Sequence, residues 1–177
     1  MKSKVAIFYS KQCEKHISGG PEIPDRVEVI LKALQDSSFI ERLEFLQPIP
    51  ATIEELEKIH KANQIKHIQN QCYKAGSYEY NYVNNDSDVV VSADSHEAAC
   101  YAAGAVRDAV KLVLTNETIN RAFCNIYSQC HKSAGFCLYN NVWFGAQAAR
   151  EILKKQGINE PRIAIIDWDL HHGDGTQ

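Results

Sequence analysis

The C-terminal stretch, residues 162–177, constrains the fold of this chain more than any other segment. It begins with an uninterrupted apolar run, residues 163–166, and continues into a segment rich in Asp, His and Gly. An apolar run without polar alternation is typical of a strand that is covered on both faces in a parallel sheet. The stretch therefore predicts an α/β fold in which this strand ends at a polar site.

The polar residues that follow the run predict a metal site. If the strand geometry persists, the side chains of Asp167, Asp169 and His171 point to one side. Those of Trp168 and Leu170 then pack on the other side. Carboxylate oxygen and imidazole nitrogen bind zinc and similar divalent ions, so Asp169 and His171 can supply two of the three protein ligands of a catalytic site. The alternative is that these residues only form a turn with capping side chains.

Composition narrows the class of protein. The chain has 177 residues, of which 45% are hydrophobic and 23% charged, as in one ordinary globular domain. Its net charge of −3 gives no electrostatic footprint for nucleic acid or an anionic membrane. No apolar stretch could span a bilayer, and no signal-cleavage pattern follows the N-terminus, so we expect a cytoplasmic protein. Six cysteines at irregular spacing, with no Cys-x-x-Cys, indicate reduced thiols rather than a zinc ribbon or disulfides.

The first half of the chain predicts one strand followed by helices. Residues 5–9 form the strand candidate, and a helix opens at Pro24 and ends near residues 37–38. A capping box of Thr52 and Glu55 begins another helix, and a short one covers residues 64–73. We interpret residues 76–88 as a surface loop because turn-forming residues are frequent there, and the alternative is a strand in which Tyr78, Tyr80 and Tyr82 alternate.

The second half predicts a long helix and a strand–helix–strand unit. Ser95 is the expected cap of the long helix, and His96 is interpreted as an exposed polar residue. Residues 122–127 form a strand candidate, and a helix that follows Asn141 stops at Gly157. This order of elements predicts a doubly wound, mostly parallel α/β sheet without repeats.

Several motifs resemble those of histone deacetylases and acetylpolyamine amidohydrolases, in particular the bacterial class II-like members. In chain order they are residues 21–26, 95–104, 135–141 and 167–177. The resemblance covers essentially the whole chain. It implies that residues 1–177 are the N-terminal portion of a single deacetylase-like α/β domain, with an arginase/deacetylase-like sheet that is incomplete in this chain.

The resemblance also implies an activity, which is the metal-dependent deacetylation of acetyl-lysine or an acetylated polyamine. The implied cofactor is zinc or another divalent transition metal, and a potassium ion could lie near residues 167–171. By position, the resemblance gives roles to the following residues: Asp169 and His171 as metal ligands, Asp167 and Asp174 as carboxylates that orient catalytic histidines, His131 as a catalytic histidine, Gly135 and Phe136 as walls of the substrate channel, and Arg26 and His172 as outer residues, Arg26 being buried behind the site.

One loop departs from the family's pattern. Family members carry two adjacent histidines there, whereas residues 128–134 contain His131 alone, followed by Lys132. One register puts Lys132 on the second histidine, the usual general base, and another puts residues 126 and 127 on the pair. An ammonium group beside a divalent cation is repelled and acts as a base only when neutral. Two readings stay open: His131 alone transfers the proton, or the chain is an impaired homologue that acts as a binding or scaffold module.

In the family, the third metal ligand and a catalytic tyrosine belong to a later part of the domain than residues 1–177. We therefore expect these residues alone to be inactive, and we expect the exposed sheet edge and apolar face to favour a homo-oligomer. An arginase-like binuclear manganese hydrolase is less favoured, because the additional Asp and His ligands of that family are not found.

Overall fold

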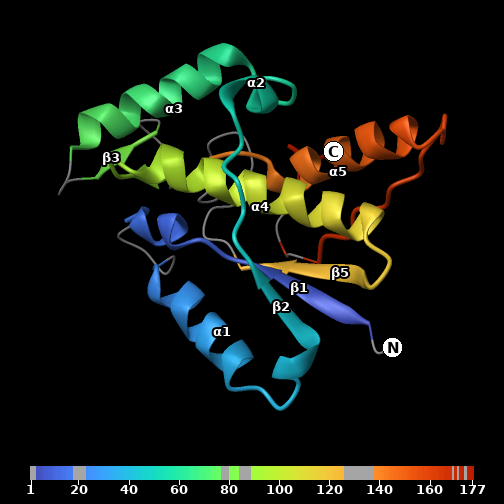
Figure 1. The fold of residues 1–177 in the computed structure, drawn as a ribbon. Helices are drawn as coiled ribbons and strands as arrows, with labels where there is room; N and C mark the ends of the chain where they lie inside the picture. The colour runs from blue at the N-terminus through green and yellow to red at the C-terminus, as the bar shows by residue number, and fades with distance from the viewer. Residues whose placement is uncertain are drawn as a thin grey trace.

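The computed structural model describes residues 3–17, 23–76, 80–83, 89–125, 138–168, 170, 172–173 and 175–177. Strands and helices alternate along much of the chain (Figure 1). In chain order, the elements are β1 (Lys4–Phe8), the 3-10 helix η1 (Lys11–Lys15), α1 (Asp25–Gln35), the 3-10 helix η2 (Ile40–Arg42), β2 (Leu43–Leu46), α2 (Ile53–Leu56), α3 (Ala62–Ala75), β3 (Asn81–Tyr82), β4 (Val90–Val91), α4 (Ser95–Thr115), β5 (Ile119–Cys124) and α5 (Asn141–Lys155).

The main sheet is parallel, with strand order β2-β1-β5. On one face, Ala6 and Phe8 of β1 pack against Ala105 and Ala109 of α4. Small residues on α4 allow its backbone to approach the sheet closely. On the other face, β1 and α1 line a common apolar pocket, and Figure 1 shows α1 beside β1 and β2. Helices therefore lie on both faces of a parallel sheet, as the sequence predicts.

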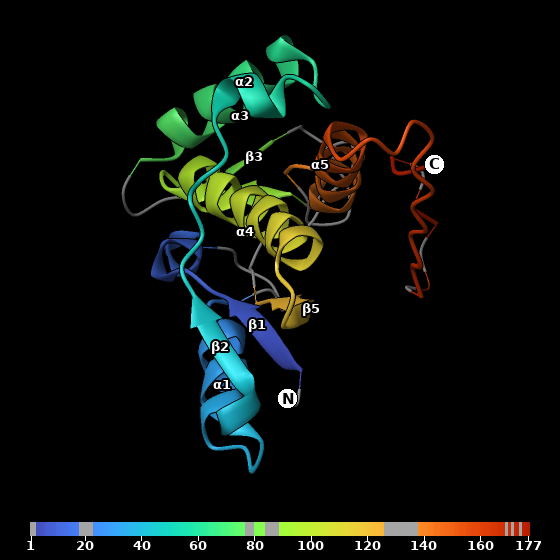
Figure 2. The ribbon, with the colours of Figure 1, turned by 45° about the vertical axis from the view of Figure 1, so that its right-hand side comes forward.

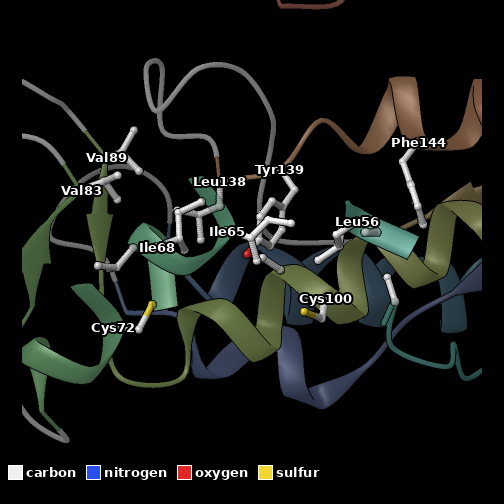
Figure 3. Packing of buried hydrophobic residues seen from close by; sticks show 14 residues of the cluster. Leu56, Ile65, Ile68, Cys72, Val83, Val89, Cys100, Leu138, Tyr139 and Phe144 are labelled. Atoms are coloured by element: carbon white, nitrogen blue, oxygen red, sulfur yellow. The ribbon is translucent and has the colours of Figure 1, made fainter. Parts of the chain in front are cut away.

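A second and larger core lies where α2, α3, the β3–β4 hairpin and α4 meet the start of α5 (Figure 3). Ile65 and Ile68 of α3 face this core, and Leu138, Tyr139 and Phe144 close it from the other side. The core thus joins α3 to the segment that enters α5.

Most predicted elements are confirmed. The capping box is present, since Thr52 Oγ1 accepts from Glu55 N at 3.2 Å and Glu55 Oε2 accepts from Thr52 N at 2.9 Å. Gly157 follows α5 with φ +89°, a conformation that favours glycine and ends the helix as predicted. Within the described residues, Cys72, Cys100 and Cys124 are free thiols.

Two local predictions are wrong. Ser95 does not cap α4: Asp94 is the N-cap residue, and the buried Ser95 Oγ accepts from Ser92 N at 2.7 Å. The stretch interpreted as a surface loop contains β3, as the alternative of a strand allowed, and its Asn81 and Tyr82 pair with Val91 and Val90 of β4. The pairing brings alternate valines into the core, which gives this short hairpin the apolar contact that it needs.

The largest difference concerns residues 163–166, which are predicted to form a buried strand. They lie in an irregular segment with no strand pairing to the described residues, and Ile166 is 81% exposed. Trp168 and Leu170, expected to pack, are 92% and 94% exposed. A buried strand needs partner strands at its edges and helices on its faces. Figure 2 shows the segment beyond α5 and away from the main sheet, so none of the described elements covers it.

No helix within the described ranges is both long and apolar enough to cross a membrane.

His16 predicts a pH dependence of stability. Its ring is buried, its Nδ1 lies 2.5 Å from Ser95 Oγ, and burial lowers its pKa to about 4. The unfolded chain has the ordinary histidine pKa of about 6.5, so it binds the proton more readily than the folded chain does. We therefore expect stability to be complete above pH 6.5 and to fall, on the order of 3 kcal/mol, as the pH drops towards 4.

Urea unfolding across this pH range measures the effect. The control is His16→Gln, which cannot titrate and should show a clearly smaller loss relative to its own stability at pH 7. An equal loss in both proteins would show that His16 does not cause it.

Candidate active site

The described part of the candidate site is organised around the turn that leads into α5. Leu138 and Tyr139 are buried immediately before that helix. The Tyr139 ring lies near two histidine rings, with centroid distances of 5.3 Å to His60 and 5.9 Å to His96. The turn is therefore fixed from the side of α2 and from the side of α4.

His96 anchors the buried end of this arrangement. Its Nε2 lies 3.1 Å from Gln69 Nε2, an amide nitrogen that can only donate, so the ring proton is on Nδ1. That Nδ1 lies 2.7 Å from the Tyr139 hydroxyl, which accepts from it. Burial lowers the pKa of His96, so the ring is neutral at neutral pH. The prediction that His96 is exposed is therefore wrong: its side chain is half-buried and bonded on both nitrogens.

The neighbouring thiols do not supply a nucleophile. Burial is the main cause that raises the pKa of Cys72 to about 11 and that of Cys100 to about 12. Both remain protonated at neutral pH, and a neutral thiol is a poor nucleophile and a poor metal ligand. This part of the core consists of uncharged, hydrogen-bonded side chains that hold the turn before α5 in place.

Asn140 connects this support to the C-terminal motif. Its backbone N–H donates to His60 Nε2 at 3.0 Å, and its side-chain Oδ1 accepts from Trp143 N at 2.7 Å. Its Nδ2 donates to Thr176 Oγ1 at 3.1 Å. Asn140, and not Asn141, is therefore the N-cap of α5, and it contacts a residue of the predicted metal motif.

The end of that motif forms a compact turn. The N–H groups of Thr176 and Gln177 both donate to the carbonyl of Gly173, at 3.1 and 3.2 Å. His172 is exposed, and its Nε2 lies 2.7 Å from Gln177 Oε1. Asp167, on the N-terminal side of the motif, is exposed as well.

The predicted site residues are only partly described. Those outside the described residues are His131, Lys132, Gly135, Phe136, Asp169, His171 and Asp174. Arg26 is exposed on α1, so the prediction that it is buried is wrong: only Val27 is buried on this helix. Figure 2 shows α1 well apart from residues 161–168.

The described residues contain no group of three or more His, Cys, Asp or Glu side chains that could hold a metal ion. The two predicted ligands, Asp169 and His171, lie outside them. The donors that these residues offer, a carboxylate oxygen and an imidazole nitrogen, are of the kind that zinc binds. The ligand chemistry therefore fits a zinc ion.

Sequence reasoning did not identify Asn140 or the network of His60, Tyr139 and His96. One signal was available, because an asparagine immediately before an apolar helix is a common N-cap. The partners of the network could not be found this way, because His96 and Tyr139 are 43 positions apart in the chain.

Comparison with known proteins gives a consistent result. Residues 20–177 match the sequence model of the histone deacetylase domain. The chain is 30% identical over 185 residues to histone deacetylase 5 of Arabidopsis thaliana, an alignment that covers 98% of this chain and 27% of that protein. It is 32% identical over 164 residues to a probable deacetylase of Archaeoglobus fulgidus, covering 89% and 42% of the two chains. It is 34% identical over 161 residues to polyamine deacetylase HDAC10 of Rattus norvegicus, covering 88% and 26%.

The fold is also similar to a solved structure. The crystal structure of the HDA15 HD domain superimposes with a TM-score of 0.79 at 24% identity, covering 99% of this chain and 50% of that one. The chain thus spans half of that structure, and between 26% and 42% of the length of the three relatives.

Proposed function

Because the chain belongs to the histone deacetylase family, we propose that it forms part of the catalytic domain of a deacetylase that acts on acetyl-lysine or an acetylated polyamine. The observation that carries the proposal is the family match over residues 20–177, which includes both the loop with His131 and the motif at residues 167–177. The names of the relatives, histone deacetylase and polyamine deacetylase, support both substrate classes. Since the chain spans less than half of these relatives, turnover is proposed for the complete protein.

In this proposal, Asp169 and His171 would hold zinc or a similar divalent ion. A bound ion would supply Lewis-acid polarisation of the substrate's amide carbonyl. As the family resemblance implies, backbone carbonyls around residues 167–171 would bind a monovalent cation such as potassium.

The remaining chemistry is acid–base catalysis by the chain's own side chains. A neutral His131 takes a proton from the attacking water as the water oxygen bonds to the amide carbon, and it returns this proton to the amide nitrogen as the C–N bond breaks, so that a carboxylic acid and an amine are released. Asp167 and Asp174 orient this imidazole through hydrogen bonds. Gly135 and Phe136 line the channel that admits the acylated amine, while His172 belongs to its surroundings.

The test is turnover by the complete protein that contains this chain. An acetyl-lysine peptide and an N-acetylated polyamine are offered separately, and the released amine is measured before and after treatment with a chelator. We expect turnover of at least one substrate, loss of turnover on chelation, and recovery on addition of zinc. No turnover of either substrate by zinc-supplemented protein would contradict the proposal.

A binding or scaffold module is the second candidate, and the sequence of the loop favours it: His131 is followed by Lys132 rather than by a second histidine. Under this alternative the natural protein is inactive, and Lys132→His is needed before any activity appears. Turnover by the natural sequence at the rate of the variant rules the alternative out.

A further inference from the structure

We infer that Asn140 is a positioning residue that couples the two segments of the proposed active site, an inference that rests on the proposed function. One segment is the loop that ends shortly before Asn140 and carries His131, Gly135 and Phe136. The other is the motif at residues 167–177. Asn140 follows the first segment closely in the sequence, and its side chain donates a hydrogen bond to the second segment.

The polar groups of Asn140 are all used. The residue is 4% exposed, and its N–H and Oδ1 bind His60 Nε2 and Trp143 N. Its carbonyl accepts from Phe144 N at 2.9 Å, within the first turn of α5. The cap needs only the side-chain oxygen. The amide nitrogen Nδ2 is therefore available to donate to Thr176 Oγ1. Serine and threonine, which can also cap a helix, have no such amide group.

The residues behind Asn140 are held by burial and hydrogen bonds. The backbone N–H of Asn140 donates to His60 Nε2, which therefore acts as an acceptor. Tyr139, the residue before Asn140, is 1% exposed and is bound to His96 through its hydroxyl. A side chain whose own position is held this firmly can fix the position of what it binds.

Thr176 is the matching point in the motif. It belongs to the turn closed by Gly173, and it follows the proposed ligand His171 after four residues. Misplacement of catalytic groups by about 1 Å can cost on the order of 100-fold in rate, and loss of an outer contact to a metal site typically costs about 10- to 100-fold. The Asn140–Thr176 hydrogen bond is therefore expected to affect turnover without touching the substrate.

Three variants of the complete protein separate this role from helix capping. Asn140→Ser keeps a capping hydroxyl but is too short to reach Thr176. Thr176→Val keeps the shape of the side chain but removes the acceptor oxygen, and Thr176→Ser retains that oxygen. The first variant removes the donor of the hydrogen bond and the second removes its acceptor, whereas the third should preserve the hydrogen bond.

We expect Asn140→Ser and Thr176→Val each to lower kcat by about 10-fold or more and to leave KM within about twofold. Thr176→Ser should keep kcat within about threefold of the natural protein. The double variant should be no slower than the slower single variant, because both changes remove one interaction. Kinetic constants are measured on whichever acetylated substrate is turned over.

Hydrogen exchange of the Thr176 and Gln177 amides provides a readout that does not depend on activity. Both amides bind Gly173, and we expect their exchange to be several-fold faster in Asn140→Ser and Thr176→Val. Unchanged exchange in both variants overturns the anchoring itself. Faster exchange with natural kcat overturns the positioning role, as does a double variant whose loss is the product of the single losses. If the natural protein turns over no substrate, the proposed function fails, and exchange alone decides whether Asn140 holds the motif.

Discussion

Replacing Gly104 by alanine is expected to destabilise the protein by roughly 4 kcal/mol or more, although the same exchange in an exposed helix stabilises by about 1 kcal/mol. The segment between β2 and α2 crosses α4 (Figures 1 and 2). Gly104 of α4 lies at this crossing, next to Ile49 and Ala51. A Cβ at this position would lie 1.9 Å from the carbonyl oxygen of Ile49 and 3.0 Å from Ala51 N. The clash is with backbone, so a change of side-chain rotamer cannot relieve it.

The crossing segment cannot easily move away. Asp108 Oδ2 accepts from Ile49 N at 2.9 Å, and Arg107 donates to Ile49 O at 2.8 Å. Ala51 N donates to the carbonyl of Cys100 at 2.9 Å. Displacing the segment would break these hydrogen bonds, and for this reason we expect the loss to exceed the usual overpacking cost of about 1–3 kcal/mol.

Gly145→Ala on α5 is the matched control. A Cβ there meets the side chain of Val106 at 2.6 Å, and that side chain can be shortened. Equilibrium unfolding should show a smaller loss for Gly145→Ala, which Val106→Ala recovers in part. Val106→Ala should give no recovery in Gly104→Ala. If Gly104→Ala unfolds at the same denaturant concentration as the natural protein, the close crossing of the two backbones is wrong.

Several elements that local pattern alone predicts are found in the structure. The α4 stripe of alanines, the capping box at Thr52 and the stop at Gly157 each depend on residues close in the chain. The errors have a shared cause, which is a partner distant in sequence. Ser95 resembles a cap, but His16 and Ser92 hold its hydroxyl, and His96 looks exposed until Gln69 and Tyr139 enclose it.

Residues 163–166 show a second way in which a prediction from local sequence pattern can fail. An apolar run forms a buried strand only when other strands pair with it and helices cover its faces, and the run itself does not provide these partners. In the structure the run is exposed, so its composition indicates a buried environment that the described elements do not provide. The motif beyond it was found from residue types alone, whereas Asn140 and its contact with Thr176 required the three-dimensional arrangement.

Replacing His171 by alanine is expected to lower deacetylase activity of the complete protein by about 1,000-fold or more. In the proposed site His171 is one of the ligands of a divalent ion. Such an ion contributes several kcal/mol to the stabilisation of transition-state charge, and each 1.36 kcal/mol corresponds to about tenfold in rate. The bound zinc, measured by atomic absorption after dialysis, should fall together with kcat.

The adjacent histidine distinguishes a ligand from a general effect on the motif. His172 is exposed and bonded to Gln177, so His172→Ala should retain zinc and lose about 10- to 100-fold in activity at most. His67→Ala, an exposed position on α3, should remain close to the natural activity. Equal losses for the His171 and His172 variants, or full zinc content in His171→Ala, would contradict the role of His171 as a ligand. Because the two neighbours differ only in position along the motif, the comparison tests the alternation of side chains from which the metal site was inferred.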